Sequence, residues 1–249
     1  MKKVIFLLLI LFPFLNYSQK GFDNKFNIQN IEMFYGIGNN FTTKDNKFLK
    51  RNFESMQMSY DYPIRTNQKI GFIYAGTITK IDEEKQIEYF NLGANHKDLI
   101  SMTKGYGNSF QLGITYSYTF PINNFYLKGK IGTGVLYLTK NTSYMEYYPA
   151  DTTQFKYKRY MTTYSDFGSK GWGVFGSVQA DFGYNFGFLS FFIGSRYVIG
   201  NAKKNNMYVE EYDYNGDNKI TLYSENLILS VLDFHLGVSF SLDDKYYQH

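Results

Sequence analysis

The sequence predicts an all-β fold: a closed, antiparallel, up-and-down transmembrane β-barrel of eight strands, with short periplasmic turns and long extracellular loops. Three observations lead to this prediction. Residues Ser109–Phe120 alternate small or polar with apolar side chains over twelve positions, which places each kind on its own face of a strand. Similar stretches recur along the chain, joined by connections that alternate between long and short. An export signal precedes all of them.

The first eighteen residues have the features of a secretory signal peptide. Lys2 and Lys3 are followed by a twelve-residue apolar run, Val4–Leu15, and then by a cleavage site near Ser18. The run is too short to cross a bilayer as a helix. We therefore expect three segments: the signal peptide at residues 1–18, the barrel at residues 19–242 and a short C-terminal tail at residues 243–249.

The composition fits one membrane barrel and argues against other classes. The chain has 249 residues and a formal net charge of +4, with scattered Lys and Arg residues, so a nucleic-acid partner is not expected. Aromatic residues make up 20% of the chain, which is typical of strands whose Tyr and Phe collect at both lipid–water boundaries. Because cysteine is absent, a lipoprotein anchor, disulfides and cysteine nucleophiles are excluded.

Eight strands can be placed in order from the alternation. They are expected at residues 28–38, 53–62, 70–81, 109–120, 125–138, 172–184, 188–200 and 226–242. The phase of the third strand is ambiguous. Short turns follow the second, fourth and sixth strands, and Pro121–Asn124 has residues that favour turn dihedrals. The long connections are expected at residues 39–52, 82–108, 139–171 and 201–225.

The apolar face of each strand is expected to meet lipid, and the polar face to line the lumen. The ionisable residues of the polar face are Glu32, Asp61, Lys128, Lys130, Asp181, Arg196, Asp233 and His235. Its uncharged residues are Ser55, Gln57, Ser59, Gln111, Thr115, Ser117, Ser177 and Gln179. A buried charge must be paired or solvated, so we expect a hydrogen-bonded network that fills the lumen, with Arg196 close to Asp233. A narrow solute path through the network is the alternative.

Asp233, His235 and Ser239 are residue types that could act as orienter, base and nucleophile of a hydrolase. All three fall on one face of the last strand, at positions i, i+2 and i+6. At a rise of roughly 3.3 Å per residue, Ser239 is too far from His235 for a hydrogen bond. We therefore predict no catalytic site and assign His235 to the lumen.

The last long connection contains a partial calcium-loop pattern. Asp213, Asn215 and Asp217 supply oxygen ligands at loop positions one, three and five. Asn218 stands where such loops have an invariant Gly, and Ser224 where they have a bidentate Glu. An ordinary hairpin turn is the alternative, and no other cofactor is expected.

The third long connection is rich in tyrosine and basic residues. Its candidate recognition residues are Tyr147, Tyr148, Tyr157, Lys158, Arg159 and Tyr160. Tyrosine offers rigid contact area at low entropic cost, and the basic groups could pair with lipopolysaccharide phosphates. An extension of the aromatic girdle with solvated charge is the alternative. Partial alternation near residues 155–157 predicts that the fifth and sixth strands project beyond the membrane as a hairpin.

The last strand carries a signal of a known family. His235, Gly237, Phe240 and Leu242 have the spacing read by the outer-membrane assembly machinery, although seven further residues follow. The chain resembles small bacterial outer-membrane β-barrel proteins of the OmpA-like and OmpW-like kind. The resemblance implies a cell outer-membrane location, a lipid bilayer with lipopolysaccharide as surroundings, and the assembly machinery as a partner.

The expected function is that of a non-enzymatic outer-membrane protein with a side-chain-filled lumen. It would act structurally or through extracellular loops in surface recognition, with a partner that the sequence does not identify. One alternative is a narrow channel or binding protein for a small solute. Another is a soluble lipocalin-like barrel, in which the aromatic face would point inward around a ligand.

Overall fold

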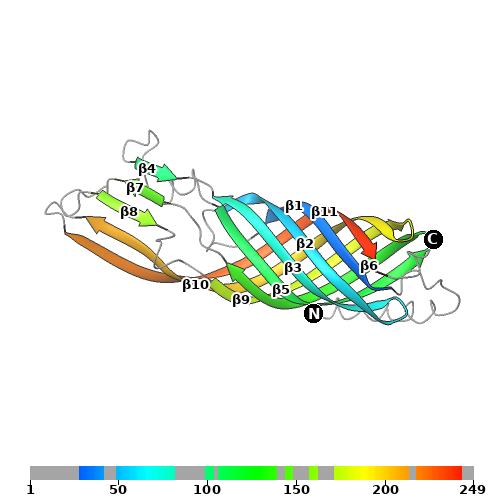
Figure 1. Ribbon diagram of the computed structural model, residues 1–249. Coiled ribbons are helices and arrows are strands. Elements are labelled where there is room, and N and C mark those ends of the chain that lie inside the picture. The colour runs from blue at the N-terminus through cyan, green and yellow to red at the C-terminus, as the bar shows by residue number, and fades with distance from the viewer. Residues whose placement is uncertain are drawn as a thin grey trace, which may run out of the picture.

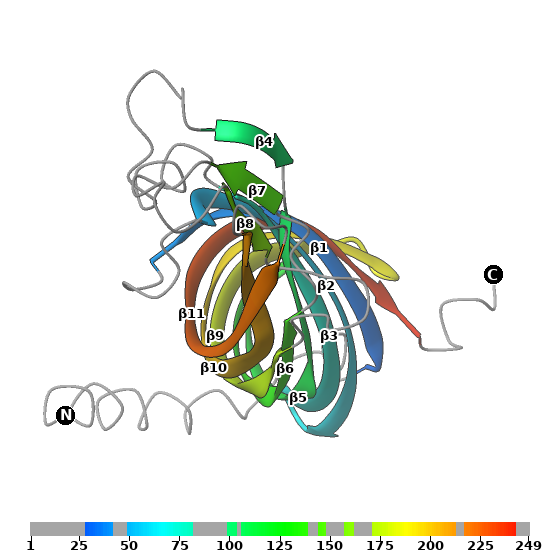
Figure 2. The same cartoon turned by 90° about the vertical axis from the view of Figure 1, so that its left-hand side faces the viewer.

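Eight antiparallel strands close into one ring. The computed structural model describes residues 28–41, 49–81, 99–103, 106–138, 144–147, 157–161, 171–212 and 217–242. In spatial order the ring consists of β1 (Asn30–Asn40), β2 (Leu49–Arg65), β3 (Gln68–Ile81), β5 (Tyr106–Ile122), β6 (Phe125–Leu138), β9 (Gly171–Asn185), β10 (Leu189–Tyr212) and β11 (Asn218–Ser241). Pairing of β11 with β1 closes it (Figures 1 and 2). The predicted fold is confirmed; the predicted signal peptide and tail lie outside the described residues.

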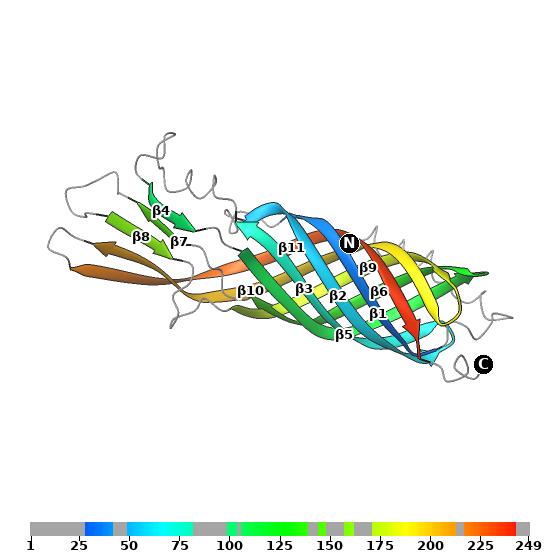
Figure 3. The same ribbon diagram turned by 45° about the horizontal axis from the view of Figure 1, so that its top comes forward.

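The strand register sets the tilt of the barrel. Paired residues followed around the ring from Phe34 on β1 lead to Leu227 on β11. Phe34 itself pairs with Gly237, so one circuit advances the register by ten residues. In closed barrels such a stagger accompanies a strand tilt of roughly 35–45°. Figure 3 shows that the strands here run obliquely to the barrel axis. A closed ring satisfies every backbone group that crosses hydrocarbon.

Three short turns lie together at the periplasmic end, as predicted. Two of them have two residues each, Thr66–Asn67 and Asn123–Asn124. Asn67 and Asn123 adopt positive φ angles of 63° and 58°, which asparagine tolerates better than most residues. The third turn contains Gly187, with a φ of 102°. Its backbone N–H donates to Asn185 Oδ1 at 2.6 Å.

The outer wall of the ring is apolar and its inner face is largely polar. Outward side chains include Tyr35, Phe72, Leu112, Val174 and Leu236, all exposed. Hydrocarbon lipid is the surroundings that such a wall requires. The soluble lipocalin-like alternative is therefore wrong, because it needs the aromatic face inside. No helix among the described residues is long and apolar enough to cross a membrane.

Aromatic rings gather on the outer wall near the periplasmic end. Phe125 stacks on Phe182 at 5.6 Å between ring centroids and meets Tyr184 edge-on at 4.8 Å. Phe186 lies 4.6 Å from Tyr184 and 5.8 Å from Phe191. These contacts form the girdle expected where a barrel wall meets the lipid–water boundary.

β10 and β11 are each 24 residues long, counting their barrel parts, and they continue beyond the extracellular rim as a hairpin. Its β10 arm pairs with β8 (Tyr157–Met161), which pairs with β7 (Tyr144–Tyr147), which pairs with β4 (Leu99–Thr103). We call these strands, with the two arms of the hairpin, the extension sheet (Figure 1). Figure 2 looks along the barrel from the side of the extension sheet.

The extension sheet corrects two predictions. Residues 201–225 were expected to form a connection, but most of them belong to β10 and β11. The fifth and sixth strands were expected to project as a hairpin, but β6 already ends at Leu138, and β7 and β8 form a separate pair. Outside lipid a strand needs no apolar face, so the alternation that identifies membrane strands is lost there.

Candidate functional site

The lumen is the candidate functional site because it collects the buried ionisable side chains of the described residues. All sixteen residues assigned to the polar face are buried. Asn30 and Lys69 are among the further buried polar residues that the sequence analysis did not assign. The phase of β3 follows from the two-residue turn before it, because Lys69 pairs with Pro63 on β2 and Ser117 on β5.

Two lysines of β6 hold the carboxylates of the periplasmic half. Lys128 Nζ lies 2.6 Å from Glu32 Oε1 and 3.1 Å from Asp181 Oδ2. Lys130 Nζ lies 2.9 Å from Glu32 Oε2 and 2.8 Å from Asp61 Oδ2. Each lysine therefore bridges carboxylates from two strands, which compensates the charges that leave water.

Asn30 connects a further cation to this group. Lys69 Nζ donates to Asn30 Oδ1 at 2.6 Å. Asn30 Nδ2 donates to Glu32 Oε1 and to Ser239 Oγ, both at 2.8 Å. With Lys69 included, four cations of Lys and Arg balance four carboxylates in the lumen.

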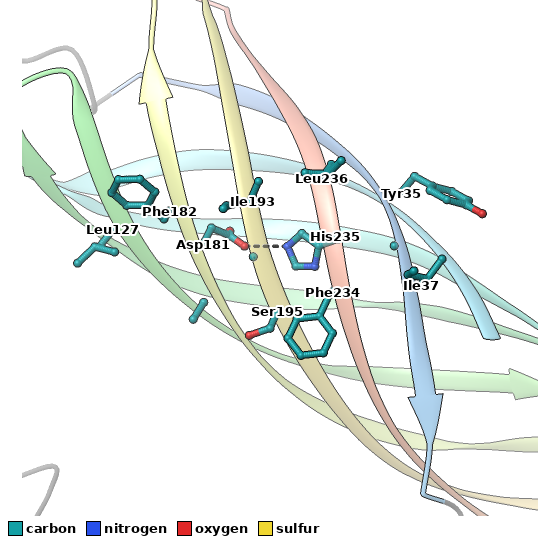
Figure 4. A pocket seen from close by; sticks show the side chains of 13 residues that line it. Tyr35, Ile37, Leu127, Asp181, Phe182, Ile193, Ser195, Phe234, His235 and Leu236 are labelled. Carbon is teal, nitrogen blue, oxygen red and sulfur yellow. Dashed lines mark hydrogen bonds and ion pairs between the residues drawn. The ribbon is translucent and has the colours of Figure 1, made fainter. Parts of the chain in front are cut away.

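His235 lies between two of the carboxylates. Its Nδ1 is 2.9 Å from Asp233 Oδ1 and its Nε2 is 2.9 Å from Asp181 Oδ1; Figure 4 draws the contact to Asp181. An ionised carboxylate only accepts hydrogen bonds, so a doubly protonated ring fits this position. Phe34 stacks on the ring with centroids 3.9 Å apart.

Arg196 lies deepest in the network, with no measurable exposure. Its Nε donates to Asp233 Oδ2 at 3.0 Å and its Nη1 to Gln57 Oε1 at 2.8 Å. Nη2 is also 3.0 Å from Asp233 Oδ2, but its N–H bonds are not directed at that oxygen. Gln57 Nε2 donates to Gln179 Oε1 at 3.2 Å, and Gln179 donates to Asp181.

The structure thus brings all eight predicted ionisable lumen residues into one connected set, which we call the charged network. Its members, with Lys69, are Glu32, Asp61, Lys69, Lys128, Lys130, Asp181, Arg196, Asp233 and His235. His235 contacts carboxylates through both ring nitrogens, so it is not paired with Ser239. Ser239 Oγ accepts from Asn30 instead.

The extracellular half of the lumen is apolar, which the sequence analysis did not predict. We call the following buried residues the apolar cluster: Phe53, Ile73, Ala75, Leu136, Phe175, Val198, Ala202, Leu229 and Val231. On β10, Val198 and Ala202 follow Arg196 toward the rim. The alternation rule assigned only polar residues to the lumen. It could not identify an inward apolar residue whose outward neighbours along the strand are apolar as well.

Two inward glycines make room for rings inside the narrow barrel. A Cβ on Gly38 would lie 2.5 Å from the Phe53 ring, and one on Gly237 would lie 2.2 Å from the Phe192 ring. Both contacts are too short for real side chains. Glycine at these positions therefore lets large residues fill the lumen.

The recognition candidates lie on the extension sheet or outside the described residues. Tyr147 ends β7, and Tyr157, Lys158, Arg159 and Tyr160 belong to β8; Tyr148 is outside. The register sets Arg159 opposite Glu146 on one side and Glu210 on the other.

The calcium pattern is described only in part. Asp213 and Asn215 lie outside the described residues, while Asp217 is exposed. Asn218 is already the first residue of β11, whereas a calcium loop turns sharply at that position. This favours the ordinary hairpin turn. Among the described residues, no group of three or more His, Asp or Glu side chains could hold a metal ion.

A groove of about 740 Å³ crosses the outer wall over β9, β10 and β11. Figure 4 shows its lining, which includes Phe182, Ile193 and Phe234 of the outer wall. These side chains face away from the lumen. Hydrocarbon would fill the outer part of the groove in a bilayer. Asp181 and His235 of the charged network also belong to its lining, beside Gly194.

Comparison with known proteins finds neither a matching family model nor a matching curated relative. Solved structures with similar folds include Neisserial surface protein A, with a TM-score of 0.41 and 10% identity over 87% of this chain and 97% of that one. Ail of Yersinia pestis has a TM-score of 0.40 and 13% identity over 86% and 98%. OprG of Pseudomonas aeruginosa has a TM-score of 0.41 and 10% identity over 86% and 96%.

The molecule's own features decide its class. The ring has no open edge at the level of the charged network, and its outer wall is apolar along every strand. The short turns all lie at one end and the extension sheet at the other. Taken together, these features identify the protein as a small eight-stranded outer-membrane β-barrel.

Proposed function

We propose that the protein is a non-enzymatic outer-membrane component with a closed lumen, which acts structurally or through its extracellular face in surface recognition. The observation that carries the proposal is the filling of the lumen at successive levels. Nearer the periplasm, paired charges such as Lys130 and Asp61 occupy it; nearer the rim, the apolar cluster does. A solute would have to break ion pairs and then cross an apolar layer.

The extension sheet supports the recognition part of the proposal. Five strands are paired there beyond the barrel, which is more order than a simple loop needs. An ordered sheet can present side chains at a low entropic cost of binding. The tyrosines and basic residues of β7 and β8 are the proposed contact residues.

Conductance tests the closed lumen. We expect purified wild-type protein to give no unitary currents in planar bilayers. Arg196→Ala should also be silent, because the apolar cluster remains in place. Steady currents through the wild type would contradict the proposal and support the narrow-channel alternative.

A shortened hairpin tests surface recognition. Residues 207–223 would be replaced by an Asn–Gly turn, which suits a two-residue hairpin and leaves the Lys204–Glu225 pair in register. The probes are arrayed glycans and extracellular-matrix proteins, with heat-modifiable gel mobility as the control for a folded barrel. We expect the full chain to bind at least one probe and the shortened chain to lose it. Equal binding by both, or none by the full chain, would remove recognition from the proposal.

Partners and cofactors complete the proposal. Phe240 and Leu242 are exposed at the end of β11, where the assembly machinery would read them together with His235 and Gly237. Lipid and lipopolysaccharide would surround the wall. We propose no cofactor; titration calorimetry with calcium chloride tests the remaining candidate, Asp213–Asp217, and a saturable heat would contradict this point.

A further inference from the structure

Several polar side chains in the middle of the lumen have no partner among the described residues. Both amide atoms of Gln111 are unpaired, as are the hydroxyls of Ser55, Thr115 and Ser117 and Oδ1 of Asp61. All five residues are 3% exposed or less. An unpaired buried polar group costs about 1–3 kcal/mol, so these five side chains, on β2 and β5, call for a common partner.

Three of these residues lie in line on one strand. Gln111, Thr115 and Ser117 are inward residues of β5, and they lead from the level of the apolar cluster toward the periplasm. Ser117 pairs in register with Lys130 of the charged network. The unpaired groups therefore form a polar column along the β5 wall, which is interrupted at Gly113, a residue that pairs in register with Ile73 of the apolar cluster.

Glycines leave room beside the column. Gly71 separates Thr115 from Asp61 in the register. A Cβ at Gly71 would lie 2.2 Å from Asp61 Oδ1 and 3.0 Å from Thr115 Oγ1. These two oxygens are thus close enough for one water molecule to bond to both. Gly36 lies similarly close to Ser55, because a Cβ at Gly36 would be 2.8 Å from Ser55 Oγ.

The column ends sharply at the apolar cluster. The next inward residue of β5 beyond Gln111 is Ser109, and its hydroxyl is 2.5 Å from Thr77 Oγ1. That pair satisfies itself, as polar groups in a dry layer must. Gln111, by contrast, pairs in register with Ala75 and Leu136 of the apolar cluster and has no such partner.

We propose that a file of internal water molecules runs along β5 from Asp61 to Gln111, and that the apolar cluster is the seal of the lumen. The barrel would then be a hydrated half-channel below a single dry layer. The charged network would hold water and would not exclude it. Water is the ligand because the hydroxyl and amide groups of the column can both donate and accept, and its members come from β2 and β5 without a shared centre.

Deuterium exchange of wild-type protein in nanodiscs tests the water file directly. We expect the Gln111 side-chain amide to exchange at least ten-fold faster than that of Gln179, whose Nε2 donates to Asp181. Gln111 should also show magnetisation transfer from water. If Gln111 is as protected as Gln179 and shows no such transfer, the file does not exist.

A matched pair of variants tests the seal. Phe53→Ser opens the apolar cluster, and Phe34→Ser makes the same change at an equally buried ring beside the charged network. We expect Phe53→Ser to raise proton flux into liposomes at least ten-fold and Phe34→Ser to leave it at the wild-type level. No rise with folded Phe53→Ser, or an equal rise with Phe34→Ser, would overturn the proposal. Wild-type ion currents would contradict the proposed function and leave the exchange result unaffected.

Discussion

The two ends of β11 obey different physical rules, although they belong to one strand. In the barrel, Leu236 points into lipid and Asp233 into a lumen that pairs it with Arg196. Beyond the rim, Ile220 is exposed on a segment of β11 that pairs, among the described residues, only with β10. In the barrel part of β11, each side chain must suit either the lipid on one face or the lumen on the other. Backbone pairing alone maintains the part beyond the rim, so sequence tolerance should differ between them.

The largest effect is expected inside the charged network. Lys130→Met would leave Glu32 and Asp61 with an uncompensated buried charge, at a cost of about 3–5 kcal/mol of folding free energy. Urea unfolding in lipid vesicles measures it. Lys130→Met with Asp61→Asn should recover part of the loss; if the double variant is no more stable than the single one, the pairing argument fails.

The apolar cluster should respond nearly as strongly. Leu136 has no measurable exposure, and Leu136→Ala would create a cavity that costs about 2–5 kcal/mol. The same unfolding measurement applies. Leu127→Ala is the matched control on the lipid face of the same strand, where Leu127 is exposed, and we expect a smaller loss there because lipid fills the space. Equal losses would mean that Leu136 is not packed in a dry layer.

The comparison within β11 can be tested by one substitution at two places. Leu236→Arg puts a charge on the lipid face and should cost about 2–4 kcal/mol if the site is near the bilayer midplane. Ile220→Arg, on the same strand beyond the rim, should change stability by less than about 0.5 kcal/mol. A comparable loss at both positions would refute the placement of the rim between them.

The smallest effect is expected in the extension sheet. Arg159→Gln removes a charge that the register sets between Glu146 and Glu210, and opposite charges paired across strands contribute roughly 0.2–1 kcal/mol. We expect the barrel's unfolding midpoint to be unchanged, while proteolysis of the extension sheet becomes faster. A shift of the barrel midpoint would show that the two parts unfold together.

Alternation predicted the ring and its polar lumen well because lipid imposes it. On β6, Lys128 and Lys130 alternate with Leu127 and Ile131, and the bounds of that strand match the prediction. Lys69 was missed because it was assigned to the turn before a strand expected at residues 70–81, whereas β3 begins at Gln68. The apolar cluster was missed because Val198 and Leu136 resemble lipid-facing residues wherever a strand is apolar on both faces.

The sequence by itself predicted eight barrel strands, their order along the chain and most of the polar residues that face inward, because contact with lipid on one face imposes a period of two along each strand. Only the tertiary structure decided which charges meet, since Lys130, Asp61 and Glu32 come from three strands whose stagger no local pattern encodes. It also decided where the lumen turns from polar to apolar and how far β10 and β11 extend. Those features depend on packing across the barrel and on backbone pairing, which side-chain alternation does not record.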